Sequence, residues 1–337
     1  MAVWEIKMTQ YIIKRLLISI LILFLVSFLM YGLIRLLPND YVDQKFQSQL
    51  EQGTVSEEDI LAMKEQYGLD DNSLWGIIKG YFKWLGNALR GDLGMSFKYN
   101  APVAEVISTY MWISFAISFI ALILEFIIAI PLGVVSATHQ YGISDYAVTV
   151  FAMMGISLPS FFLGSLLIKI FYVDLGWFPQ GGLVSATNDL TGFAGAMDVA
   201  WHCVLPMVTL VILSIGGMMR YTRTNTLEVL NSDYIRTARA KGLSEHTVIY
   251  KHVFRNTMIP LVTTMAGILP SLFSGAMITE EIFALPGIGQ MAYQALKAGD
   301  IPFIMGYNMF LAILTVIGTF FTDIAYMIVD PRVKLNK

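Results

Sequence analysis

One acidic residue, Glu125, stands near the middle of the long apolar stretch 111–137 and is the residue best placed to do chemistry. A charge inside such a stretch is costly in hydrocarbon, so ionisable residues there are functional candidates. Glu125 could act as a neutral, protonated acid or contact an amine that crosses the membrane. The alternative is a hydrogen bond to a neighbouring helix, in this chain or in a partner subunit. We therefore treat Glu125 as a substrate-pathway candidate.

Motifs for catalysis, metal binding and nucleotide binding are missing from the sequence. The 4 histidines show no ligand spacing, and His246 and His252 fall on nearly opposite faces of a helix. The sequence has no H-E-x-x-H, no G-x-S-x-G and no Gly-Lys dipeptide, which the phosphate loop G-x-x-x-x-G-K-[ST] requires. The single cysteine, Cys203, excludes an internal disulfide. We expect no catalytic residue, no metal site and no cofactor bound by this chain.

The composition is that of a membrane protein. Hydrophobic residues make up 56% of the 337 residues and charged residues 14%, whereas a soluble domain has about 25% charged residues. A helix needs about 20 apolar residues to cross a bilayer. Six stretches reach that length: Leu16–Leu37, Met111–Ala137, Ala147–Val173, Ala200–Met219, Met258–Ile282 and Phe303–Val329. The sequence predicts an all-α membrane protein with six transmembrane helices. It has no basic surplus, which argues against nucleic-acid binding.

Lys and Arg are concentrated on one side of these predicted spans. The segments on that side hold 13 Lys and Arg in 70 residues, against 7 in 119 residues on the other side. The basic segments are 1–15, 138–146, 220–257 and 330–337. The opposite segments are 38–110, 174–199 and 283–302. Because basic loops stay in the cytoplasm, we predict that both termini are cytoplasmic.

The long outer segment, 38–110, is predicted to contain two helices. Ser56 and Asp59 indicate a helix start, and Gly68 indicates its end. Apolar and aromatic residues then recur at helical spacing over residues 74–85, which is typical of an amphipathic helix in the membrane interface. Such a helix either caps the bundle or offers a docking surface to an external partner.

The inner segment 220–257 is predicted to hold a short helix between two long ones. Asp233 can cap a helix over Tyr234–Lys241, and Gly242 can end it in the left-handed conformation. Ser244 then starts a second helix that runs into the fifth span. A short rigid helix joined to two membrane helices can pass a push from a soluble partner into the bilayer. The alternative is a basic turn anchored at anionic head groups.

The stretch Asp233–Leu243, DYIRTARAKGL, resembles the cytoplasmic signature of importer-type ABC permeases in its peptide-permease form. The family pattern Glu-Ala-Ala followed by Gly falls on Arg236, Thr237, Ala238 and Gly242, so the Glu and the first Ala are replaced here. Further matching motifs are Gly91–Ser96, Leu158–Phe161, Leu175–Pro179, Glu280–Gly289 and Asp330–Arg332. The chain is similar to B-type subunits of the oligopeptide/dipeptide (peptide/nickel) permease family.

This resemblance implies a type I ABC importer permease fold and a role in peptide import. The short inner helix would be the coupling helix, seated on a separate ATPase. The residues of this ATPase coupling would be Arg236, Thr237, Ala238, Arg239, Gly242 and Leu243. The implied partners are a second homologous permease, two ABC ATPase subunits that use ATP and Mg, and an extracytoplasmic peptide-binding protein. The implied location is the cell membrane, in contact with lipid.

The predicted organisation has three parts: 1–37 with the first transmembrane helix, 38–110 outside the membrane, and 111–337 as a five-helix permease core with the coupling segment 220–257. One alternative within the same fold and two from other classes remain open. The same fold could import nickel chelates, glutathione or another small solute. A secondary transporter would need inverted repeats with broken helices, and the two halves show no convincing repeat. An intramembrane enzyme would need a nucleophile and a base at one depth, which Glu125 alone does not supply.

Overall fold

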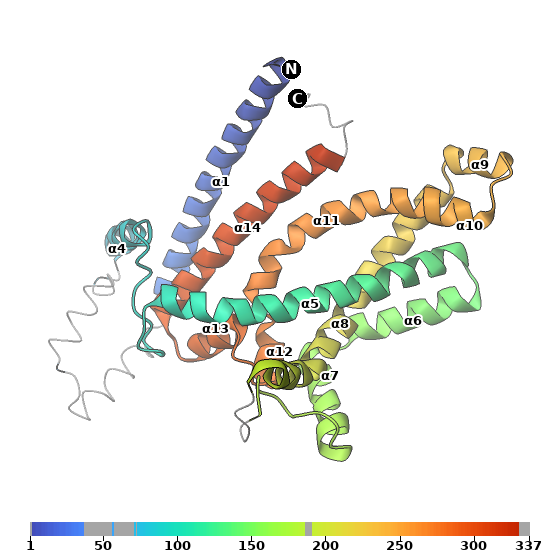
Figure 1. Ribbon diagram of the computed structural model, residues 1–337. Coiled ribbons are helices and arrows are strands. Elements are labelled where there is room, and N and C mark those ends of the chain that lie inside the picture. The colour runs from blue at the N-terminus through green and yellow to red at the C-terminus, as the bar shows by residue number, and fades with distance from the viewer. Residues whose placement is uncertain (1, 37–55, 57–70, 72, 186–190, 330–337) are drawn as a thin grey trace. The chain divides into compact units, whose positions relative to one another are not determined.

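The computed structural model describes residues 2–36, 56, 71, 73–185 and 191–329, and these residues are mainly helical (Figure 1). One isolated antiparallel bridge, between Met95 and Pro102, interrupts the helical pattern of this described part. Contacts divide the chain into two units, and each is considered by itself. Unit 1 comprises the described parts of Met1–Trp112 and Met291–Phe320, and unit 2 comprises those of Ile113–Gln290 and Phe321–Val333.

Unit 1 contains α1 (Ala2–Leu36) and α4 (Leu74–Ala88), which pack against each other. Tyr81 of α4 is fully buried, and its hydroxyl lies 2.8 Å from the hydroxyl of Ser27 on α1. The Tyr81 ring also meets the rings of Phe24, Phe28 and Tyr31 on α1. Aromatic packing together with the polar contacts of the Tyr81 hydroxyl therefore fixes α4 on α1.

The α4 helix confirms the amphipathic helix that was predicted over residues 74–85. Its aromatic residues divide between two environments, since Tyr81 packs on α1 while Trp75 and Phe82 are exposed. Exposed aromatic side chains of this kind suit the boundary between lipid and water. The other predicted outer helix, from Ser56 to Gly68, lies outside the described residues except for Ser56 itself.

Four helices within the described part of the chain are long and apolar enough to cross a membrane. They are α1, α5 (Val103–Thr138), α8 (Gly192–Leu230) and α14 (Ile301–Val329). These helices correspond to the first, second, fourth and sixth predicted spans. The α8 helix passes through Pro206 without a break and extends beyond both ends of the predicted stretch 200–219. Proline is tolerated in such helices when neighbouring groups satisfy the freed carbonyl.

The third predicted span, Ala147–Val173, is sharply bent instead of straight. The helix α6 (Ile143–Ser157) is followed by α7 (Ser160–Leu167) and its continuation, the π-helix η1 (Ile168–Asp174), at an angle of 102°. Pro159 accounts for the bend, because proline keeps the residue before it extended, here at ψ 131°. With this bent pair counted as one span, the described residues contain up to 5 candidate spans.

The fifth predicted span, Met258–Ile282, is divided into α11 (Phe254–Ser274) and α12 (Met277–Ile282). The break falls at Gly275, which has a φ of 72° and so adopts a conformation that favours glycine. The prediction of one continuous helix was wrong here. A run of apolar residues does not reveal that one glycine within it leaves the helical conformation.

A buried carboxylate, Glu280, stabilises the segment after this break. Its Oε1 accepts the hydroxyl of Ser114 at 2.7 Å and the N–H of Ala276 at 3.0 Å. Its Oε2 accepts the N–H of Gln290 at 2.9 Å. These three donors offset the cost of removing a carboxylate from water. A Cβ at Gly289 would lie 2.8 Å from Oε2, so the glycine of the Glu280–Gly289 motif makes room for this carboxylate.

Candidate coupling site

The predicted short inner helix is present as α9 (Asp233–Ala240), which directly follows α8 (Figure 1). A second helical run follows it, made of α10 (Glu245–Thr247), the π-helix η2 (Val248–Val253) and α11. The hydroxyl of Ser244 accepts the N–H of Thr247 and caps this run, which confirms the predicted helix start. The α9 helix is therefore connected on both sides to a long helix.

The start of α9 differs from the prediction by one residue. The sequence predicts Asp233 as the cap of a helix that begins at Tyr234, but Asp233 is itself the first helical residue and Ser232 holds the cap position. The Ser232 hydroxyl donates to the carbonyl of Val229 at 2.6 Å and so does not cap α9. Asp233 instead places its carboxylate in the first turn, where the helix dipole favours a negative charge.

Gly242 ends α9 in the left-handed conformation, with a φ of 77°. This confirms the predicted end of the helix. The N–H of Gly242 donates to the carbonyl of Arg239 at 3.0 Å, and that of Leu243 donates to the carbonyl of Ala238 at 3.4 Å. These bonds close the helix end, as in other helices that terminate at a left-handed glycine. A Cβ at Gly242 would meet nothing within 4 Å. Another residue there would therefore suffer from backbone strain and not from a clash.

The inner side of α9 packs on η2 through a small apolar cluster. Ile235 of α9 and both Val248 and Val253 of η2 are fully buried, and Ala238 is only 7% exposed. This packing makes α9 and the start of the following helical run one rigid body. Ala238, which was predicted to take part in coupling, thus faces the body of this chain. Its small side chain lets α9 approach η2 closely.

A pair of charged side chains closes the turn after α9. Arg239 donates from Nη2 to Oε1 of Glu245 at 2.5 Å and from Nε to Oε2 at 3.1 Å. This hydrogen bonding lowers the pKa of Glu245, so its carboxylate is ionised at neutral pH. The side chains are 44% and 57% exposed, so the pair adds little to stability. Its two parallel bonds mainly fix the direction in which the chain leaves the turn at Gly242.

The outer side of α9 and of the following turn is exposed. Tyr234 is 49% exposed, Leu243 40% and Tyr250 62%, and the side chain of Arg236 is 73% exposed. Thr237 is also exposed, and its hydroxyl donates to the carbonyl of Asp233 at 2.9 Å. Exposed aromatic residues with an arginine are enriched at protein interfaces. Arg236, Thr237 and Leu243 therefore lie where a partner can reach them.

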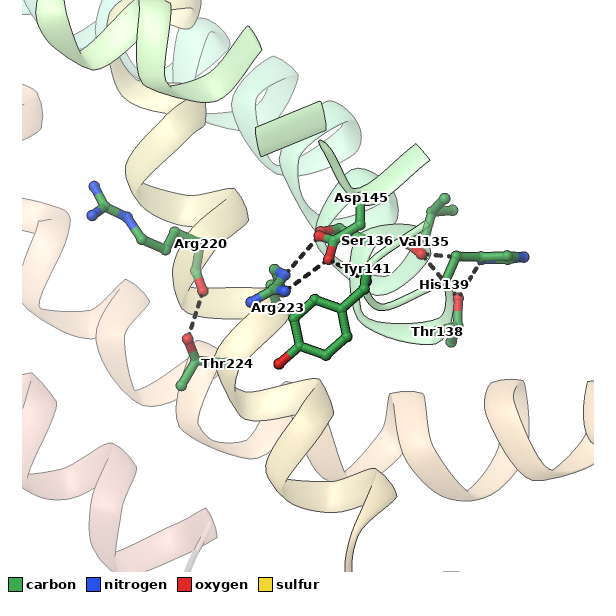
Figure 2. Close-up of polar contacts among 9 residues, drawn as sticks. All are labelled: Val135, Ser136, Thr138, His139, Tyr141, Asp145, Arg220, Arg223 and Thr224. Carbon is green, nitrogen blue, oxygen red and sulfur yellow. Dashed lines mark hydrogen bonds and ion pairs between the residues drawn. The ribbon is translucent and has the colours of Figure 1, made fainter. Parts of the chain in front are cut away.

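A buried ion pair that the sequence analysis missed lies near the end of α8 that leads to α9 (Figure 2). Arg223 of α8 donates from Nε and Nη2 to the two carboxylate oxygens of Asp145 on α6, at 2.9 and 2.8 Å. Asp145 is only 3% exposed and also accepts the N–H of Tyr141 and the hydroxyl of Ser136. The pair therefore fixes α8 to the start of α6 and to the turn before it. Arg223 lies near the end of α8, and α9 follows soon after.

Glu125 of α5 lies close to Ser214 of α8. The Ser214 hydroxyl donates to the carbonyl of Val211 at 3.3 Å. The coupling residues and Glu125 are in unit 2 but form separate sites, because Glu125 lies within the span of α5 whereas α9 follows the end of α8. Its role in a substrate pathway stays a prediction.

Comparisons with known proteins cover nearly the whole chain. The family model "Binding-protein-dependent transport system inner membrane component" matches residues 129–335. The chain is 37% identical over 328 residues to the oligopeptide transport system permease protein AppB of Bacillus subtilis (strain 168), covering 97% of this chain and 100% of that protein. It is 32% identical over 331 residues to the dipeptide transport system permease protein DppB of the same strain, covering 98% and 99%.

A solved structure with a similar fold is that of the MetNI methionine ABC transporter in inward-facing conformations. The match has a TM-score of 0.52 and covers 67% of this chain and 96% of that chain. At 21% sequence identity, this likeness concerns the arrangement of the helices alone.

Proposed function

The chain belongs to the family of inner membrane components of binding-protein-dependent transport systems, and from this premise we propose that it forms half of the translocation pathway of a peptide importer. Family membership makes the chain an ABC transporter permease subunit, an integral membrane protein distinct from the ATPase. This confirms the predicted class and fold. It also decides against the secondary transporter and the intramembrane enzyme.

Peptides are the proposed substrate because relatives named for oligopeptide and dipeptide transport match this chain from end to end. This end-to-end match is the observation that carries the proposal. Nickel chelates, glutathione and other small solutes remain alternatives within the same fold. The described helices do not by themselves distinguish these substrates, since their apolar side chains can pack against other helices as well as line a substrate pathway.

The proposed complex contains a second homologous permease, two ABC ATPase subunits and an extracytoplasmic peptide-binding protein. ATP and Mg would be bound by the ATPase subunits and not by this chain. The charge distribution supports cytoplasmic termini, since the segments on that side hold 13 Lys and Arg in 70 residues. In this orientation α9 lies in the cytoplasm, where an ATPase subunit can reach it.

The geometry of α9 supports a mechanical role. An ATPase that moves against Tyr234, Arg236 and Leu243 would displace α9 as a rigid body, because Ile235 and Ala238 are packed on η2. The displacement would reach α11 through η2 and reach α8 through the short turn at Ser232. The ion pair of Asp145 and Arg223 would carry it on to α5 and α6. A push at one short helix would thus move several membrane helices together.

The experiment that tests this function combines copurification with uptake. The tagged chain, purified gently from cells that produce it, is expected to bring down ATPase subunits. A strain that lacks the chain is expected to lose uptake of labelled peptides and to recover it when the chain is restored. If ATPase subunits copurify but the strain that lacks the chain still takes up peptides as before, the peptide substrate is contradicted and the ABC complex is not. Absence of ATPase subunits would contradict the proposed complex.

Replacement of Glu125 by glutamine tests its place in the substrate pathway. Glutamine keeps the size and the hydrogen-bonding capacity of the side chain but carries no charge, so we expect Glu125→Gln to change peptide uptake by less than about twofold, or about 0.4 kcal/mol. Uptake is measured at equal amounts of the chain in the membrane, with Ser214→Ala as the control for a change beside Glu125 that leaves its charge in place. A tenfold loss of uptake in Glu125→Gln alone would instead place its charge in contact with the substrate.

A further inference from the structure

A groove of 230 Å³ runs between α6 and α8, beside the ion pair of Asp145 and Arg223. Both helices belong to unit 2, and both contribute residues at helical spacing to the wall of the groove. On α8 these residues are Gly216, Met219, Arg220 and Arg223, which cover about two turns. A groove that follows two packed helices over this length suits an elongated ligand.

Two arginines offer accessible donors at one end of this groove. Arg220 is exposed, and the bond drawn for it in Figure 2 involves its backbone carbonyl, which accepts the hydroxyl of Thr224 at 3.0 Å. The Arg220 guanidinium has no acceptor within the described part of the chain. Arg223 uses Nε and Nη2 for Asp145. Its Nη1 is not buried and has no acceptor among the described residues, and the side chain is 25% exposed. A ligand can therefore reach both guanidinium groups.

Two tyrosines lie at the same end of the groove. Tyr141 is 73% exposed and lies beside Arg223 (Figure 2). Its φ is 63°, a rare value for a bulky residue, and its N–H donates to the carboxylate of Asp145 at 2.9 Å. Tyr146 of α6 is 61% exposed. The hydroxyls of both tyrosines can donate to a ligand in the groove.

The charges of the groove wall favour an anion. The charged residues that line the groove, among those that the structure describes, are Arg220, Arg223 and Asp145. Because Arg223 and Asp145 neutralise each other, the wall keeps one positive charge, that of Arg220. A phosphodiester carries one negative charge and balances this wall. A guanidinium also presents its N–H groups in a fork that fits phosphate oxygens.

The wall changes from polar to apolar along the groove. Arg220 is the first residue after the apolar stretch 200–219, and Tyr146 is the last residue before the apolar stretch 147–173. Met153, within the second stretch, lines the other end of the groove and is 48% exposed. The polar end therefore lies at the boundary between lipid and water, where tyrosines are common, and the other end lies in hydrocarbon.

We propose that this groove binds an anionic phospholipid, with its phosphate at Arg220 and Arg223 and one acyl chain along Met153 and Ile156. The two tyrosine hydroxyls supply further donors to the phosphate or the glycerol. Basic pockets between membrane helices are known to bind anionic head groups. The bound lipid would tie α6 to α8 beside the ion pair. This site requires only that the chain spans a membrane and is independent of the transported substrate.

The test uses the full-length chain with the subunits that copurify with it, freed of lipid in detergent, and native mass spectrometry measures lipid binding. Phosphatidylglycerol is added, with two parallel probes: phosphatidylcholine, and glycerophosphoglycerol as the same head group without acyl chains. We expect phosphatidylglycerol to bind about fivefold more tightly than phosphatidylcholine, the factor that one arginine contributes at a membrane surface. Glycerophosphoglycerol should not bind at the same concentrations, and Arg220→Gln should remove the preference for phosphatidylglycerol.

Arg255→Gln is the matched control, because Arg255 of α11 is also exposed but does not line the groove. It should keep the fivefold preference. A second variant, Tyr141→Phe, removes a hydroxyl donor but keeps the ring, and we expect it to weaken phosphatidylglycerol binding by about threefold. An unchanged preference in Arg220→Gln, or equal binding of the two lipids by the wild type, would overturn the site.

A phosphatidylglycerol with a photoreactive group on its acyl chain locates the bound lipid. We expect crosslinks to residues 149–156 of α6 to be enriched over those to the other spans, and to decrease about fivefold in Arg220→Gln. Crosslinks that are no more frequent there than elsewhere would place the lipid outside the groove and overturn the site. Equal binding of glycerophosphoglycerol would overturn its assignment to a lipid, as would displacement of the lipid by a transported peptide.

Discussion

Gly242→Val is expected to leave the chain in the membrane while it lowers ATP-driven peptide uptake by about tenfold, or about 1.4 kcal/mol. The reason is the φ of 77° at Gly242, since a β-branched residue held in that conformation is strained by about 1–3 kcal/mol. The strain is relieved if the end of α9 unwinds, which would shift Leu243 and the bond from Arg239 to Glu245. Uptake and ATP hydrolysis are measured together in proteoliposomes of the complete complex. We expect ATP hydrolysis to continue while uptake falls.

Two further substitutions separate backbone conformation from side-chain bulk. Asparagine tolerates the left-handed conformation better than valine does, so Gly242→Asn should retain most of the uptake. Gly217 lies in the middle of α8, also with nothing within 4 Å of an added Cβ but without a positive φ. Gly217→Val should therefore have little effect. Normal uptake by Gly242→Val would contradict the assignment of α9 as the coupling element.

Asp145→Ala is expected to destabilise the chain by about 3 kcal/mol, because it leaves Arg223 without its counter-charge in a largely buried site. Asp145 is 3% exposed, whereas the side chain of Arg223 is 25% exposed and can reach some water. We therefore place the expected loss at the low end of the range for a broken buried pair. The measurement is the free energy of unfolding in mixed micelles of the purified chain.

The exposed ion pair of Lys169 and Asp174 is the matched control. Its N–O distance is 2.9 Å, close to that of the buried pair, but its side chains are 67% and 48% exposed. Lys169→Ala should therefore cost less than about 1 kcal/mol. The double variant Asp145→Asn with Arg223→Gln should recover part of the loss, since neither partner is then a lone buried charge. A similar loss for Lys169→Ala and Asp145→Ala would refute the argument from burial.

Features that depend on residues close together in the chain can be predicted from the sequence alone. Apolar runs of membrane length predicted the helices α1, α5, α8 and α14, because a membrane helix satisfies its own backbone and needs only an apolar surface. The end of α9 at Gly242 and the cap at Ser244 were also predictable, since both are decided within a few residues. The cap of α9 was misplaced by one residue because Ser232 and Asp233 are both good cap residues.

Features that join distant residues become visible only in the folded chain. Asp145 and Arg223 are 78 residues apart, and a single sequence does not say which charged residues meet. The segment after the break at Gly275 is stabilised by Glu280, which accepts the hydroxyl of Ser114 from another helix. Arg35, at the end of an apolar stretch, is only 4% exposed, and its position in the sequence does not reveal this burial. The cost of burying a charge depends on its surroundings in space, which local sequence patterns do not contain.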